Sequence, residues 1–134
     1  EWVDDPDQYN QEVTDDQFKA QVSRLSKRIP NLPIPNKQQG IVDLYDVSDD
    51  WIPIYDATDL DGFYLAIGTS GNQYKNGPVI GQLMAEIIDA CEQGHDHDKE
   101  PVKVKMRHID YNLDAKIFSR KREVIENSTF SVLG

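Results

Sequence analysis

A polar loop at residues 68–77 carries the residue types best suited to contact a small organic ligand. Glycine lets a backbone approach a flat ligand without a clash from a Cβ atom, and three glycines lie here, at Gly68, Gly71 and Gly77. Pro78 suits the first position of a helix. The amides of residues 77–80, apart from Pro78, would point outward and carry the positive end of the helix dipole. The pattern favours a site for an anion or an electron-rich ring, and it is equally compatible with a tight strand-to-helix connection.

Three other groups of residues invite a chemical interpretation. Residues 95–98 alternate histidine with aspartate, and both types can bind zinc, so a metal-dependent hydrolase using His95 and His97 is one alternative. Two histidines without a companion cluster are more typical of a hydrophilic loop, and no metal site is predicted. Cys91 lies on the apolar face of its predicted helix, which favours packing over a nucleophilic role. The basic residues 119–122 favour a solvated turn over a phosphate site.

The loop needs a strand before it and a helix after it. Residues 63–67 are continuously apolar, as in a strand that is covered on both faces. After the loop, apolar residues recur at helical spacing up to Cys91 and form one broad stripe. Gly94 suits the end of that helix. The loop would thus leave the carboxyl end of a strand, where ligand crevices form in open α/β sheets.

The first third of the chain supplies fewer elements. A capping pattern opens at Thr14, and apolar residues follow at helical spacing, which predicts a helix over residues 14–29. β-branched and aromatic residues predict strands at 40–47 and 51–55. Pro53 places the second of these strands at a sheet edge.

Composition restricts the class of protein. The 134 residues carry a formal net charge of −10, which argues against nucleic acid or an anionic membrane as a partner, because both select for basic surfaces. No apolar run reaches the ~20 residues of a membrane-spanning helix, and no secretory leader is visible. The single cysteine, Cys91, excludes an intrachain disulfide. We therefore expect a cytoplasmic protein.

From about residue 12 to residue 94, the chain resembles the C-terminal part of the D-amino-acid oxidase, sarcosine oxidase and glycine oxidase superfamily. Residues 40–54 are similar to the family's strand that ends in Thr-Pro-Asp with a Pro-Ile nearby. Residues 62–68 are similar to its last flavin-domain strand. Residues 68–81 resemble its flavin loop, Gly-Phe-Ser-Gly-His-Gly-Phe-Lys, and the helix that follows.

The flavin-loop likeness is the most specific of the three. Glycines recur in register together with Ser70, Lys75 and the helical Gly81. The departures are Asn72 in place of the His of sarcosine oxidases, Gln73 in place of a Gly, and Asp49 in place of the Pro of Thr-Pro-Asp. These departures indicate a substrate that differs from that of the best-known members.

The resemblance implies an α+β fold that is the C-terminal part of a two-domain flavoprotein. Residues 1–57 would end the antiparallel substrate domain, and residues 58–94 would return as the last strand and helix of the FAD-binding domain. Residues 95–134 would form a C-terminal tail, in which residues 119–120 and 130–134 resemble the close of sarcosine-dehydrogenase-like members. The residues of this tail themselves predict a short strand at 102–106 and an apolar patch at 130–134 that docks. The partner would be the N-terminal half of the same polypeptide, which holds the pyrophosphate of FAD.

The resemblance also implies oxidation of the C–N bond of a secondary amine or amino acid, with FAD reoxidised by dioxygen or by an electron-transfer protein. FAD contacts would fall on Gly68, Thr69, Ser70, Gly71, Asn72, Gln73, Tyr74 and Lys75, with the amides from Ser70 to Asn72 at the pyrimidine edge. Lys75 would pair with a substrate carboxylate, and Asn72 is the second catalytic candidate. Asp43, a charge within an apolar strand, is a further substrate-binding candidate.

The chain without the N-terminal half should bind FAD poorly and turn over no substrate. The apolar strand at 63–67 would be left partly bare, so we expect self-association. The competing class is a small acidic, non-catalytic module that binds a protein partner.

Overall fold

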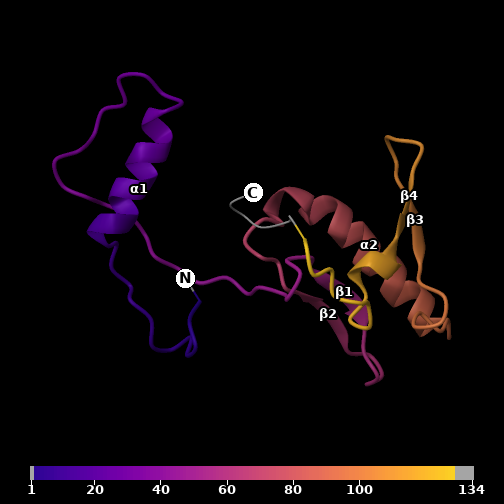
Figure 1. Cartoon of the computed structure of the whole chain (residues 1–134). Helices are drawn as coiled ribbons and strands as arrows, with labels where there is room; N and C mark the ends of the chain where they lie inside the picture. The colour runs from indigo at the N-terminus through magenta and orange to yellow at the C-terminus, as the bar shows by residue number, and fades with distance from the viewer. Residues whose placement is uncertain (1, 129–134) are drawn as a thin grey trace. The chain divides into compact units, whose positions relative to one another are not determined.

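The computed structural model describes residues 2–128, which form an α+β structure with two helices and two small antiparallel sheets (Figure 1). The chain divides into two compact units, Glu1–Leu44 and Tyr45–Gly134. The mixed α and β class is confirmed. The apolar patch predicted at 130–134 lies outside the described residues.

The first unit contains one helix, α1 (Asp15–Ser26). The Thr14 hydroxyl oxygen accepts a hydrogen bond from the Gln17 amide at 3.3 Å, which confirms the predicted helix and its cap. No side chain among residues 2–44 is buried, and Leu25, within the apolar stripe, remains 46% exposed. Local signals rather than a core therefore account for this helix.

The strand predicted at residues 40–47 is wrong, because this segment forms no strand. β-branched and aromatic residues favour a strand only where a neighbouring strand completes the ladder. Here the backbone carbonyl of Asp46 accepts its hydrogen bond from Ser70, a loop residue, at 2.9 Å. The segment is therefore not part of a sheet.

The second unit begins with a hairpin. Strand β1 (Ile54–Ala57) pairs antiparallel with β2 (Tyr64–Ile67). The strand predicted at 51–55 thus starts later than expected. Pro53 has no amide to donate to a ladder, and Trp51 has a φ of 63° and closes a turn by donating to the Ser48 carbonyl at 3.0 Å.

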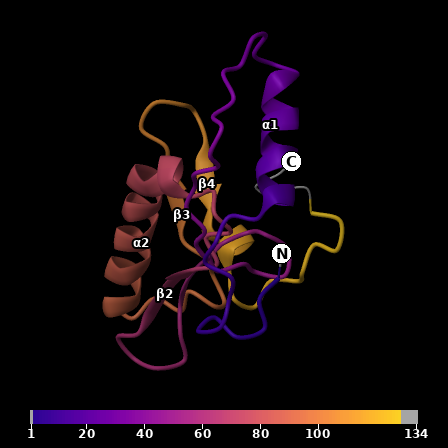
Figure 2. The same cartoon turned by 90° about the vertical axis from the view of Figure 1, so that its left-hand side faces the viewer.

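Helix α2 (Gly77–Glu92), preceded by the short 3₁₀ helix η1 (Tyr74–Asn76), packs on β1 and on a second hairpin. That hairpin joins β3 (Lys103–Lys105) to β4 (Asn112–Asp114) and confirms the strand predicted at 102–106; Figure 2 shows it running alongside α2. The 3₁₀ helix η2 (Ala115–Phe118) follows. The core consists of Tyr55, Leu83, Ile87, Val104 and Ala115.

The strand before the loop is less covered than its composition suggests. Phe63 is 54% exposed and Ile67 is 46% exposed. The prediction that this strand is buried on both faces is therefore wrong for this chain taken alone. The expectation that the strand is left partly bare is confirmed. No helix among residues 2–128 is both long enough and apolar enough to cross a bilayer.

Candidate functional site

The loop between β2 and η1 has a well-defined backbone path. Gly68, Ser70 and Gly71 all have positive φ values, of 67°, 50° and 72°. The positive φ of Gly68 favours glycine there, and a Cβ at this position would also make a tight contact, 3.3 Å from the Cβ of Ser48. Ser70 adopts a left-handed conformation that is uncommon outside glycine. Its side chain is fully buried, and its hydroxyl donates to the Gly68 carbonyl at 3.1 Å.

Most amides of this loop are engaged inside the protein. The amides of Gly68 and Thr69 donate to the Asp46 carboxylate, and the Ser70 amide donates to the Asp46 carbonyl at 2.9 Å. The Asn72 amide donates to the Thr69 carbonyl at 3.2 Å. Of the three amides expected to meet a flavin ring, only that of Gly71 makes no hydrogen bond within residues 2–128. The Gln73 amide likewise makes no hydrogen bond within residues 2–128.

The helix start differs from the sequence-based expectation. Helical hydrogen bonding begins with η1, and the Gly77 amide donates to the Tyr74 carbonyl, so an outward amide at Gly77 is wrong. The amides at the start of a helical segment have no hydrogen-bond acceptor within the helix, and they lie before the first helical hydrogen bond. The positive end of the segment therefore lies nearer Gln73, within the loop itself.

Three of the predicted side chains lie close together. The Lys75 ammonium donates to the Asn72 carbonyl at 3.0 Å, and the side chains of Asn72 and Gln73 are hydrogen-bonded to each other. The Gln73 side-chain oxygen also accepts from the Tyr55 hydroxyl at 3.3 Å. Lys75 itself is exposed. Asp43 belongs to the first unit, where its carboxylate accepts from the neighbouring Leu44 amide at 2.8 Å.

The residue that sequence reasoning missed is Asp46. Burial acts to raise the pKa of its carboxyl group, but hydrogen bonds from the Thr69 hydroxyl and from the Gly68 and Thr69 amides outweigh it, so the pKa lies below the usual value. The bond from the Thr69 hydroxyl measures 2.9 Å. The only sequence signal was an acidic residue two positions before Ser48, where the turn begins, and nothing local reveals its contact with a loop more than twenty residues away.

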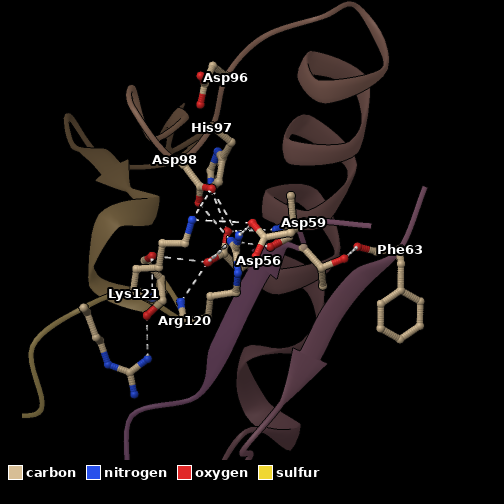
Figure 3. Close-up of polar contacts among 12 residues, drawn as sticks. Asp56, Asp59, Phe63, Asp96, His97, Asp98, Arg120 and Lys121 are labelled. Atoms are coloured by element: carbon tan, nitrogen blue, oxygen red, sulfur yellow. Dashed lines mark hydrogen bonds and ion pairs between the residues drawn. The ribbon is translucent and has the colours of Figure 1, made fainter. Parts of the chain in front are cut away.

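A second polar cluster surrounds the fully buried Asp56 (Figure 3). Its Oδ2 atom accepts from the Arg120 amide at 2.7 Å and from the Arg120 guanidinium at 3.2 Å. The same guanidinium binds Asp98 at 2.9 Å and Asp59 at 2.7 Å, and Lys121 binds Asp98 at 2.6 Å. The turn predicted at residues 119–122 is present, and Lys121 in it is exposed, but full solvation is wrong, because the Arg120 and Arg122 side chains are largely buried against carboxylates.

Residues 95–98 form a loop, as predicted, with Asp96 and Asp98 exposed. His97 within it is buried, contrary to the expectation, and completes this cluster. Its Nδ1 atom accepts from the Val102 amide at 3.2 Å, which leaves the proton of the neutral ring on Nε2, 3.5 Å from Asp56 Oδ1. Burial lowers the pKa of the imidazole, partly offset by the Asp56 carboxylate. The Nδ1 lone pair is thus already used by the protein. Within residues 2–128, no three His, Cys, Asp or Glu side chains converge as a metal site would require.

Cys91 behaves as a packing residue. It lies against the core on α2, and burial raises the pKa of its thiol, with a smaller contribution from the Asp56 carboxylate. A raised pKa keeps the group as the unreactive thiol at neutral pH.

Comparisons of this chain with protein-family models, with curated proteins and with solved structures find no match.

Proposed function

We propose that this chain is the C-terminal part of an FAD-dependent oxidoreductase that oxidises the C–N bond of a secondary amine or amino acid. The observation that carries the proposal is the β2–η1 loop, whose backbone is held by internal hydrogen bonds while the amides of Gly71 and Gln73 donate to no acceptor within residues 2–128. The resemblance of residues 68–81 to a flavin loop supports the same assignment.

The chain's own contribution would be electrostatic. Two amide donors at fixed positions, next to the positive end of a helical segment, stabilise negative charge on a ring edge without having to reorganise. The chemistry that bound FAD would supply is acceptance of a hydride equivalent from the carbon next to the substrate nitrogen. The loop amides of this chain favour the reduced, more negative form of the ring, and FAD would contact residues 68–75 mainly through the backbone.

Lys75 is the proposed substrate-binding residue. Its ammonium group has three donors, and one of them is used by the Asn72 carbonyl at 3.0 Å. Two donors remain for a substrate carboxylate. Asn72 lies next to this ammonium group and is the proposed polar contact at the reacting centre.

The decisive experiment joins this chain to the polypeptide that precedes it in its gene. We expect an upstream Gly-x-Gly-x-x-Gly sequence and a yellow protein with a flavin spectrum that a secondary amine or amino acid bleaches. A colourless protein would overturn the proposal. In the yellow protein, Lys75→Ala should raise KM for a carboxylate substrate at least about tenfold, as expected when a charged hydrogen bond is lost.

Lys99→Ala is the matched control, because Lys99 is an exposed lysine of the same unit whose partner is Asp96. An equal KM for Lys75→Ala and the parent protein would remove Lys75 from the substrate site. For the chain by itself, light scattering should show self-association, and a monomer at high concentration would contradict this expectation.

A second candidate function is a small acidic, non-catalytic module that binds a protein partner. The exposed apolar residues Phe63 and Ile67 on and beside β2 favour it, because exposed apolar patches often mark interaction sites. A flavin absorption spectrum distinguishes the two candidate functions. A stable, colourless monomer that binds a protein supports the non-catalytic module.

A further inference from the structure

Asp46 contacts the glycine loop through both its side chain and its main chain. The carboxylate accepts hydrogen bonds from the amides of Gly68 and Thr69 and from the Thr69 hydroxyl, the last at 2.9 Å. Its backbone carbonyl accepts from the Ser70 amide at 2.9 Å. Three consecutive loop residues are therefore held by a single residue that lies more than twenty positions earlier in the chain.

The turn at residues 48–51, which follows Asp46, is held by Arg122, a residue about seventy positions later in the chain. Arg122 binds the buried Asp50 carboxylate through two nitrogens, at 2.9 and 2.6 Å, and donates to the Ile52 carbonyl at 2.7 Å. The Ser48 hydroxyl donates to the same carbonyl at 2.7 Å. Asp46 is thus attached to a fixed turn, and its contacts position the loop.

The hydrogen bonds that Asp46 accepts engage some amides of the β2–η1 loop and leave others without an acceptor in the described part of the chain. They occupy the amides of Gly68, Thr69 and Ser70, whereas those of Gly71 and Gln73 donate to no acceptor in the described part of the chain. The left-handed φ values of Ser70 and Gly71 turn the chain at this point.

We propose that Asp46 is the positioning residue of the ligand-binding loop, and that its carboxylate keeps the amides of Gly71 and Gln73 available to a ligand. The inference rests on the proposed function only for the identity of that ligand, because the contacts of Asp46 exist without it. A carboxylate is required, since its two oxygens accept from three donors. An asparagine would place a donating NH₂ group against one or more of them.

The first experiment is Asp46→Asn in this chain, with amide hydrogen exchange followed residue by residue by NMR. Exchange at Gly68 and Thr69 should accelerate about tenfold, the loss expected for charge-assisted hydrogen bonds. Exchange at Leu83, in the core helix, should not change. Asp49→Asn is the matched control, because Asp49 is an exposed aspartate of the adjoining turn. Unchanged exchange at Gly68 and Thr69 would overturn the proposal.

Thr69→Val provides a second, milder variant in case Asp46→Asn does not fold. It removes the hydroxyl that donates to Asp46 at 2.9 Å and should accelerate exchange at Thr69 less than Asp46→Asn does. In the Asp46→Asn background the same change should add little, because the bond is already lost. Full additivity of the two changes would contradict the shared contact.

The second experiment measures FAD affinity of the protein joined to its upstream half. Asp46→Asn should raise the dissociation constant of FAD about tenfold while the melting temperature stays near that of the parent, an outcome that a merely stabilising residue would not give. If the exchange experiment succeeds but the parent protein retains no FAD, the proposed function fails while the positioning role of Asp46 stands. If FAD affinity is unchanged while exchange accelerates, Asp46 does not position the ligand site.

Discussion

The two compact units of this chain are stabilised by different means. Residues 2–44 form a capped helix without a single buried side chain, whereas the hydrophobic core and every ion pair between described residues lie within residues 45–128. In the first unit, neighbours in sequence are sufficient to define the helix. In the second, residues distant in sequence hold one another. The loop of the candidate site, residues 68–77, lies in the second unit. Its conformation therefore depends on contacts between residues that are distant in sequence.

The largest difference between the two units is expected when one leucine in each is replaced by alanine. Leu83 is fully buried, so Leu83→Ala should lower the free energy of unfolding by about 3–5 kcal/mol, the usual loss for a buried leucine. Leu25 is 46% exposed, so Leu25→Ala should cost less than about 1 kcal/mol. Urea unfolding followed by circular dichroism measures both. Equal losses would show that the first unit has a core of its own.

The next largest effect concerns the Arg122–Asp50 pair. Arg122→Ala leaves the fully buried Asp50 carboxylate without its cation and should cost about 3 kcal/mol of unfolding free energy. The exposed Arg24 of α1 provides the control, and Arg24→Ala should change stability by less than about 0.5 kcal/mol. A double-mutant cycle with Asp50→Asn should show strong coupling between Asp50 and Arg122. Independent effects would contradict a direct pair.

Acid should weaken the second unit selectively. Hydrogen bonding to Arg122, only partly opposed by burial, lowers the pKa of Asp50 to about 2 from the ordinary value of 3.8. A group whose pKa is lowered by folding stabilises the fold above its unfolded pKa, and this stabilisation is lost as the pH falls through the folded pKa. Urea titrations between pH 6 and about pH 2 should therefore show a loss of roughly 2 kcal/mol from this group.

Asp50→Asn provides the control for the acid experiment. The variant should be less stable near neutral pH, and it should lose less stability than the parent on acidification, because it has no carboxyl group to protonate at this position. An identical pH dependence in both proteins would show that Asp50 does not titrate as expected.

The smallest effect is expected at the helix cap of the first unit. Thr14→Ala removes the hydroxyl that accepts from the Gln17 amide at 3.3 Å, and it should destabilise α1 by about 1 kcal/mol. NMR chemical shifts of residues 15–18 should move toward coil values. Those of Leu83 and its neighbours should stay unchanged, and a shift there would show that the two units depend on each other.

Elements with local signals can be recognised from the amino-acid sequence alone. Thr14 with the apolar stripe behind it specified α1, and Pro78 with the stripe up to Cys91 specified α2. The loop between β2 and α2 was also recognisable, because glycines concentrate there. These features need only a helical repeat, a cap or a backbone conformation that glycine supplies.

The charged residues that form long-range hydrogen bonds and ion pairs can be identified only in the folded structure. Asp43 and Asp46 lie three positions apart in one segment, and nothing local in the sequence indicates that Asp46 accepts hydrogen bonds from the glycine loop, at Gly68 and Thr69. The basic residues at 119–122 looked like a solvated turn until their distant partners were brought beside them, Arg120 at Asp56 and Arg122 at Asp50. The physical reason is that a charged side chain has no periodic signature in sequence, and its role depends on which distant groups the fold places within hydrogen-bonding distance.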